Sequence, residues 1–200
     1  MNTLNSLTPD TAPTRTALDR EAWTTFALSV LAEEGLDGLR VEVLARRLNV
    51  TKGSFYWHFK DRQALLNAVT SHWRDQRIQE VEAQATVPAE QARAHIHAII
   101  DHYSTQPNRQ RMQLELAMRD WARRDQLVAA AVEAVDQARL INATRLFELA
   151  GFAAEEAHTR ALLMFTHVFG LSMMMFEESI STDIAARHSA IASLITRDQP

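Results

Sequence analysis

Apolar residues recur at helical spacing along most of the chain, and the alternating pattern of a β-strand is absent. The first such stretch lies between Asp19 and Gly35. Asp is a good N-cap and Gly readily ends a helix, so a helix from Asp19 to Glu34 is predicted. Its apolar stripe comprises Trp23, Phe26, Ala27, Val30 and Leu31.

A second pattern, from Leu39 to Phe59, predicts two short helices joined by a tight turn. The first helix has its apolar stripe at Val41, Leu44, Ala45 and Leu48. Asn49 tolerates the left-handed conformation that ends a helix, and Thr51 is a suitable N-cap for the next one. That next helix, 52–59, is too short to be stable alone, so Phe55 and Phe59 are expected to anchor it in a core.

The groups left on the outside of the second short helix are polar or aromatic: Lys52, Gly53, Ser54, Tyr56, Trp57 and His58. An α-helix fits the DNA major groove, and a tight turn can hold one there. Gly53 would let the backbone approach a phosphate. The pattern therefore predicts a DNA-binding helix-turn-helix.

The remaining periodic stretches predict further helices, so the fold is expected to be all-α. Asp61 should cap a helix that reaches about Ala85 and includes Trp73, and Pro88 should open the next one. Pro107 is interpreted as a break between two helices. The later helices are expected at 109–122, 125–150, 154–179 and 183–196.

The chain has a net charge of −4, but one segment of it carries a local excess of positive charge. Between Arg40 and Arg62 there are six basic and two acidic side chains, a local +4. Phosphate contact requires such a field, so this distribution favours a nucleic-acid partner for the helix-turn-helix.

Other chemistry finds little support in the sequence. The chain has no cysteine, and no apolar run approaches the roughly 20 residues of a membrane-spanning helix. Residues 1–16 lack a secretion signal and are expected to be a disordered arm, which indicates a cytoplasmic protein without membrane association. His95 and His97 point to different sides of a helix, and His95 and His102 lack an acidic partner. No metal, cofactor or enzymatic activity is expected.

The segment LDGLRVEVLARRLNVTKGSFYWHFKDRQALLNAV resembles the DNA-binding domain of TetR-family transcriptional regulators. The likeness covers about Leu18 to Val69, roughly a quarter of the chain. It is carried by Gly35-Leu36, Leu44-Ala45, Val50-Thr51-Lys52-Gly53, Phe55-Tyr56-x-His58-Phe59, Lys60-Asp61-Arg62 and Ala64-Leu65-Leu66.

The resemblance implies an N-terminal three-helix domain at 17–70 and a C-terminal helical ligand-binding and dimerisation domain at 71–200. It also implies a repressor that leaves DNA when a small molecule binds. Two positions depart from the family pattern: Asn49 stands where many members have Gly, and Leu39 to Glu42 replaces a Thr-Thr pair and an Arg.

On double-stranded DNA the expected contacts fall into two groups. The phosphate backbone would be held by Thr51, Lys52, Gly53, Tyr56, His58 and Lys60. Base edges would be sampled by Ser54 and Trp57, together with Arg40 or Glu42. Glu42 has two alternatives, which are to read cytosine or to orient an arginine.

Two-fold symmetry favours a homodimer on a palindromic operator, because one short reading helix supplies little affinity. Apolar stripes on the last two helices predict the dimer interface, unless they pack only within the chain. Its residues would be Ala161, Phe165, Val168, Leu171, Met175, Ile191, Leu194 and Ile195.

Bulky and adaptable side chains of the middle helices could enclose an unknown small-molecule ligand. The alternative is ordinary core, which is the more common role of a methionine-rich stripe. The candidates are His102, Met118, Trp121, Phe147, Met164 and His167. Two rival functions stay open. One is an activator or a ligand-independent repressor; the other is a helical small-molecule-binding or interaction protein that no longer binds DNA.

Overall fold

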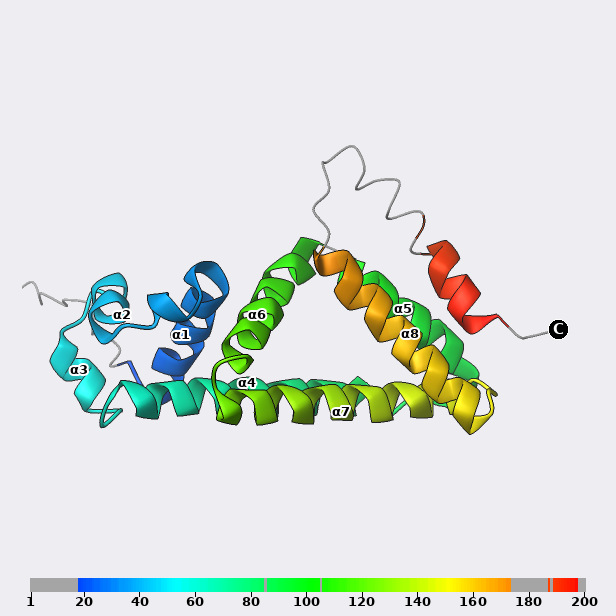
Figure 1. Ribbon diagram of the computed structural model, residues 1–200, viewed down its shortest axis with the longest axis horizontal. Coiled ribbons are helices and arrows are strands. Elements are labelled where there is room, and N and C mark those ends of the chain that lie inside the picture. Colours follow the sequence, from blue (N-terminus) through cyan, green and yellow to red (C-terminus); the bar gives the residue numbers. More distant parts are fainter. Residues whose placement is uncertain (1–17, 85, 105, 174–186, 188, 198–200) are drawn as a thin grey trace, which may run out of the picture.

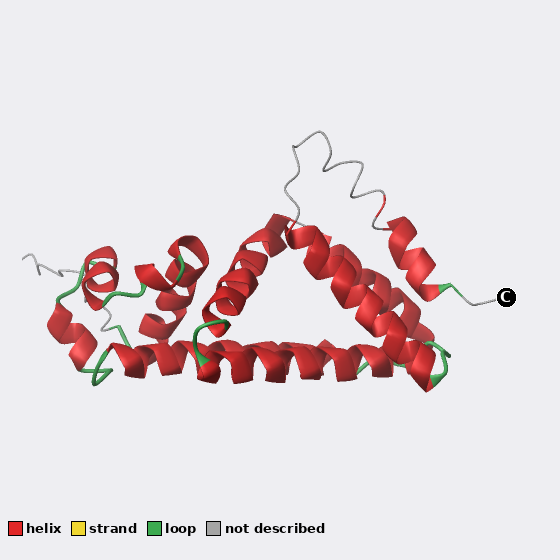
Figure 2. Ribbon diagram, in the orientation of Figure 1, coloured by secondary structure: helices red, strands yellow, loops and turns green. Residues whose placement is uncertain are grey.

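A computed structural model describes residues 18–84, 86–104, 106–173, 187 and 189–197. Helices make up the regular structure of this part, which contains no strand (Figure 2). The all-α expectation is confirmed. In chain order the elements are α1 (Arg20–Glu34), η1 (Leu36–Gly38), α2 (Val41–Arg47), α3 (Lys52–Tyr56), α4 (Arg62–Gln84), η2 (Ala89–Gln91), α5 (Ala92–Ser104), α6 (Gln106–Ala122), α7 (Gln126–Leu149) and α8 (Ala154–Met173). Residues 189–196 are also helical.

The long helices α4 and α7 lie side by side and form the base of the molecule (Figure 1). The small helices α1, α2 and α3 gather at one end of this base. Helix α6 rises from the base near α1 and contacts it, while α5 and α8 rise from the other end. Helix α4 therefore belongs both to the three-helix head and to the larger helical body.

Local side-chain chemistry sets most helix ends where the sequence predicts them. The carboxylate of Asp19 accepts the backbone N–H of Ala22 at 2.7 Å, and Gly35 ends α1 with φ 70°. Asn49 has φ 53° in the turn between α2 and α3. The hydroxyl of Thr51 accepts the N–H of Ser54 at 3.4 Å, so it caps α3.

Three predicted boundaries differ from the structure. Helix α3 ends at Tyr56, and Trp57 and His58 form a turn that still carries Phe59 into the core. Helix α6 begins at Gln106, so Pro107 lies in its first turn, where the missing N–H of proline has no helical acceptor. The stretch 154–179 is described only as far as Met173.

One hydrophobic cluster extends from the three-helix head into the body. It contains Trp23, Phe55 and Phe59 of the head together with Trp73 of α4, and it continues through Met118 and Trp121 of α6 to Val135 of α7. A second cluster, around Phe147 and Ile96, holds α5, α7 and α8 together. The predicted domain boundary near Ser71 thus falls inside α4, and apolar packing crosses it.

The burial of Phe55 makes a prediction about stability. Phe55→Ala should lower the free energy of unfolding by about 3–5 kcal/mol, because the fully buried ring leaves a cavity beneath α3. Chemical denaturation followed by circular dichroism would measure the change. Tyr56→Ala, at the exposed neighbouring position, should change it by only about 0.5 kcal/mol. Equal losses in the two variants would contradict this account of the core.

Candidate nucleic-acid interface

Helix α3 is held in place by aromatic packing beneath it. The ring of Phe55 meets Trp23 of α1 edge-on at 5.5 Å between centroids, and it stacks on Phe59 at 5.3 Å. Arg20 of α1 adds a second attachment, because its guanidinium donates to the carbonyl of His58 at 2.7 Å and lies 4.4 Å from the centre of the Phe59 ring. These contacts fix a five-residue helix that could not persist by itself.

The opposite side of α3 and the turn after it are open to solvent. Trp57 is 87% exposed and Tyr56 is 58% exposed. At Gly53 an added Cβ would meet only the hydroxyl oxygen of Thr51, at an ordinary 3.5 Å. The fold itself therefore has room for a side chain at Gly53, so the small residue is available for an approach from outside.

Partners within the chain occupy part of the local positive charge. Lys52 pairs with Glu42 at 2.8 Å, and Arg47 pairs with Glu33 and Glu34 at 2.7 and 2.6 Å. The hydrogen bond from the Lys52 ammonium lowers the pKa of the Glu42 carboxyl, with smaller contributions from its backbone and from Coulomb attraction. Glu42 thus orients Lys52 in the free protein. One of the two alternatives from the sequence was that it orients an arginine.

The remaining predicted contact residues lie around this face. Thr51 and Lys60 are exposed, and Ser54 and His58 are half-buried. Arg40 is exposed and donates from Nε to the carbonyl of Asp37 at 3.1 Å. The structure brings the predicted DNA-contact residues onto the short segment made by α2, α3 and the adjoining turns.

The sequence analysis did not predict that Arg20 and Arg62 hold the backbone of the helix-turn-helix in place. The Arg62 guanidinium donates to the carbonyls of Leu39 at 2.6 Å and Leu36 at 3.3 Å, so it holds the segment that leads into α2. Both arginines bond to backbone carbonyls far away in the chain, and such contacts leave no local pattern.

The predicted pocket residues do not share one site. Met118 and Trp121 are buried in the cluster that joins the body to the head, and Phe147 is fully buried in the second cluster. Met164 is the one of the six that lines a small, partly open pocket of about 20 Å³. His102 is exposed on α5 and His167 is half-buried on α8. Met118 and Trp121 share their cluster with residues of α1 and α4, and their part in a ligand pocket stays a prediction.

The residues of the predicted dimer face differ in their burial, and their part in a dimer stays a prediction. Ala161 and Val168 are buried within the chain, and Phe165 packs against the second cluster, because this stripe of α8 faces α7. Leu194 is exposed, whereas Ile191 and Ile195 are half-buried. The side chains of Leu171 and Met175 lie outside the described part. Among the described side chains of α8, the large apolar residues that are exposed are Leu162 and Leu163.

Among the described residues, no helix is long and apolar enough to cross a membrane. This described part also contains no group of three or more His, Cys, Asp or Glu side chains that could hold a metal ion.

The helix-turn-helix segment is similar in sequence to known regulatory proteins. Residues 25–69 match the family model described as bacterial regulatory proteins, tetR family. The class C tetracycline repressor protein of Escherichia coli is 46% identical over 52 residues, which are 26% of this chain and 24% of that protein. The class A protein from transposon 1721 is 49% identical over 43 residues, which are 22% of this chain and 20% of that protein. The chain thus spans about a quarter of the length of the curated relatives it matches.

Solved structures extend the likeness to the body. Salmonella enterica GusR has a TM-score of 0.65 with 13% identity and covers 92% of this chain and 98% of its own. A bacterial regulatory protein in the tetR family from Rhodococcus RHA1 has a TM-score of 0.62 with 19% identity, over 94% of this chain and 100% of its own. Residues 25–69 are thus similar to the DNA-binding domain of the TetR family, and the chain as a whole shares the fold of these structures. At these identities the likeness of the body is one of fold.

The ion pair between Lys52 and Glu42 makes a prediction about the pKa of Glu42. In Lys52→Met the Glu42 pKa should rise toward its ordinary value, because the ammonium that stabilises the ionised carboxylate is gone. NMR titration of the side-chain carboxyl would measure it. Arg46→Met, an exposed cation of the same helix, should leave the Glu42 pKa nearly unchanged. A rise of the same size in both variants would mean that the general field, rather than the pair, lowers this pKa.

Proposed function

We propose that this protein is a DNA-binding transcriptional regulator, and more specifically a homodimeric repressor that a small-molecule ligand releases from its operator. The observation that supports it best is the exposed face of α3, held outward by the buried rings of Phe55 and Phe59. The match of residues 25–69 to the TetR family model supports the same reading.

On DNA, α3 enters the major groove with Gly53 near the phosphate backbone. The Gly53 backbone can approach closely because no side chain stands there, and Tyr56 and Lys60 contact phosphates at either side. Trp57, the most exposed large apolar residue of the described chain, contacts base edges, where an apolar ring can meet a thymine methyl group. Glu42 keeps Lys52 extended beside this face.

The dimer forms through α8 and the C-terminal helix 189–196. Leu162, Leu163 and Leu194 supply its exposed apolar surface. The C-terminal helix is attached to α8 by Arg160, which donates to the carbonyls of Ile195 and Arg197, so the two helices present one face. Two reading helices then lie about 34–36 Å apart and enter successive major grooves.

Ligand release works through the shared hydrophobic cluster. Helix α4 belongs to both parts, α6 contacts α1, and Met118 and Trp121 lie in one cluster with residues of α1. A shift in the body is thus transmitted to α3 through packed side chains. A ligand that prefers the shifted body lowers operator affinity, and DNA weakens ligand binding by the same factor.

A substitution at Gly53 should weaken DNA binding without destabilising the fold. Gly53→Ala should raise the free energy of unfolding by about 0.5–1 kcal/mol, because alanine is the better helix former and the added Cβ meets only an ordinary contact. The same change should weaken binding to the protein's own upstream DNA by roughly tenfold or more, because the Cβ separates backbone and phosphate. Fluorescence anisotropy on a labelled duplex would measure it.

The control is Gln126→Ala, which truncates an exposed side chain in the first turn of α7, away from α3 and from the proposed dimer surface. It should leave DNA affinity unchanged. If Gly53→Ala binds as well as the wild type, the assigned approach of α3 is wrong. If the wild type binds no upstream duplex at any salt concentration, a helical interaction protein without DNA binding becomes the better description.

The dimer surface can be tested on its own. Leu162→Glu combined with Leu163→Glu should convert the dimer to monomers, because four carboxylates would be brought into an apolar interface. Sedimentation equilibrium at micromolar concentration would show the halved mass, and operator affinity should fall with it. Leu127→Glu changes a half-exposed leucine at the start of α7 and should leave the dimer intact. A dimer that persists in the double variant would move the interface elsewhere.

A further inference from the structure

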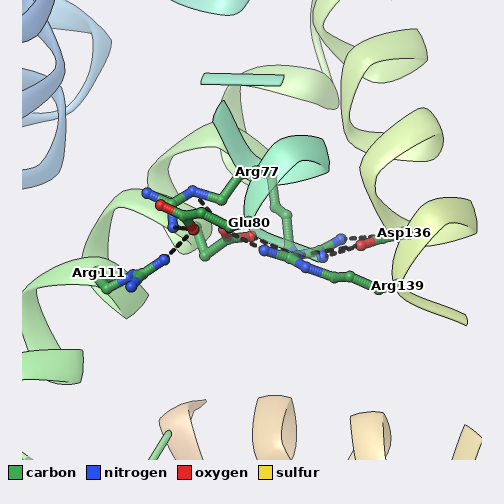
Figure 3. A network of polar contacts seen from close by, with 7 residues as sticks. Arg77, Glu80, Arg111, Asp136 and Arg139 are labelled. Atoms are coloured by element: carbon green, nitrogen blue, oxygen red, sulfur yellow. Dashed lines mark hydrogen bonds and ion pairs between the residues drawn. The ribbon is translucent and has the colours of Figure 1, made fainter. Parts of the chain in front are cut away.

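The ion pairs of the body and of the three-helix head differ in burial. In the body, where α4, α6 and α7 meet, the Glu115 carboxylate lies 2.6 Å from the Arg139 guanidinium and 3.8 Å from Nε of Arg77 (Figure 3). These side chains are at most 10% exposed. In the head, the Glu42 carboxylate lies 2.8 Å from the Lys52 ammonium, but the two side chains are 62% and 58% exposed. The pair in the head therefore presents both of its charges to solvent.

Stability does not account for the pair between Glu42 and Lys52. An exposed ion pair contributes little to the free energy of folding, because water screens the attraction and two long side chains lose freedom. The pair joins α2 to α3, and these helices already share one hydrophobic cluster through Val41, Leu44 and Phe55. The position of the pair on the surface is therefore more informative than its contribution to packing.

The pair lies at the beginning of both helices of the helix-turn-helix. Glu42 is the second residue of α2, and Lys52 is the first residue of α3. In a helix-turn-helix, the residues that contact base edges are those at the start of the second helix. On the proposed function, the carboxylate and the ammonium thus reach the major groove together, next to Gly53.

A carboxylate at this position is unfavourable for binding to DNA in general. Within residues 40–62 only Glu42 and Asp61 are acidic. Asp61 accepts the backbone N–H of Ala64 at 2.8 Å, so it caps α4. The hydrogen bond from Lys52 lowers the pKa of Glu42, so this carboxyl is ionised at neutral pH and repels phosphates. A carboxylate on this face is favourable where the duplex offers it a hydrogen-bond donor.

The pair matches the major-groove edge of one G·C base pair. Guanine offers the acceptors O6 and N7, to which a lysine donates, and cytosine offers its N4 amine, from which a carboxylate accepts. O6 and N4 are hydrogen-bonded neighbours in the base pair, as the ammonium and the carboxylate are in the protein. Both contacts can therefore form while the ion pair stays intact. Adenine also has a donor beside an acceptor, but it gives the ammonium N7 alone, so an A·T pair loses one hydrogen bond.

We propose that the ion pair of Glu42 and Lys52 recognises one G·C base pair in each half of the operator, with Lys52 on guanine and Glu42 on cytosine. This inference rests on the proposed function. On other sequences the carboxylate has no donor and repels the phosphates, so Glu42 also acts against the wrong partner. Lys52 is thereby a base-reading residue, in place of the phosphate contact expected from the sequence.

A selection experiment locates the base pair. The full-length protein selects its preferred sites from a library of randomised DNA duplexes, and sequencing gives the base preference at each position. The wild type should select a two-fold symmetric site with a G·C pair at one fixed position of each half. Glu42→Gln and Lys52→Met should each lose the preference at that same position and keep it elsewhere. Losses at two different positions, or an even loss at all positions, would overturn the proposal.

Fluorescence anisotropy then compares the selected duplex with a duplex in which A·T replaces this G·C pair. The wild type should prefer the selected duplex on the order of 10- to 100-fold, and this preference should fall to a few-fold in each single variant. The double variant Glu42→Gln/Lys52→Met keeps the net charge, so it should lose the preference without losing affinity for the A·T duplex.

A lysine on phosphate gives a different result. In that case Lys52→Met would weaken both duplexes equally and reduce the salt dependence of log K by about one unit, with the preference for G·C retained. That outcome would contradict the assignment of Lys52 to guanine.

A second exposed pair of the head supplies the matched control. Glu33 of α1 binds Arg47 of α2 at 2.7 Å and is 46% exposed, so Glu33→Gln removes the same charge from a pair that does not involve α3. It should keep the base preference of the wild type. Because Glu42 and Lys52 are exposed, thermal unfolding should give nearly the same Tm for all of these variants. Loss of the G·C preference in Glu33→Gln would assign it to the general field, against the proposal.

The two proposals fail in distinguishable ways. A wild type that enriches no duplex would remove the DNA-binding regulator, and the recognition of G·C with it. A wild type that enriches a symmetric site, with no position that both Glu42→Gln and Lys52→Met alter, would keep the regulator and remove the role of the ion pair.

Discussion

The DNA-reading face depends on one packing interaction, the burial of Phe55 against Trp23 and Phe59. A helix of five residues has too few internal hydrogen bonds to outweigh its conformational entropy. Its direction is therefore set by the side chains beneath it and by the hydrogen bond from Arg20 to the His58 carbonyl. Because these contacts hold α3, the helix stays ordered although Tyr56 and Trp57 are exposed to solvent.

The same packing continues into the body, and this continuity gives a physical route between the body and the DNA-reading face. Trp73 on α4 and Trp121 on α6 both belong to the cluster that contains Phe55. Close-packed interiors respond to a displaced neighbour by repacking as a unit, because few voids exist to absorb the movement. A displacement of α7 thus has a contiguous path to the reading helix, through α6 and α4.

Buried charge distinguishes the body from an ordinary helical bundle. Apolar side chains of similar size would hold α4, α6 and α7 together at least as well as Arg77, Glu115 and Arg139 do. A buried ionic network of this kind is therefore weak evidence for stability alone.

The sequence by itself determined the local features: the helices, the caps at Asp19 and Thr51, the left-handed turn at Asn49 and the outward set around Trp57. These follow from contacts between residues a few positions apart, which periodicity and capping chemistry report directly. Tertiary structure decided the role of Met118 and Trp121 in the shared core, the inward direction of Ala161, and the meeting of Arg77 with Arg139. The sequence held one signal for this meeting, a charged residue on an apolar stripe. Arg139 follows Val132 and Val135 at helical spacing. Its partners lie on other helices, so only the packing of those helices could identify them.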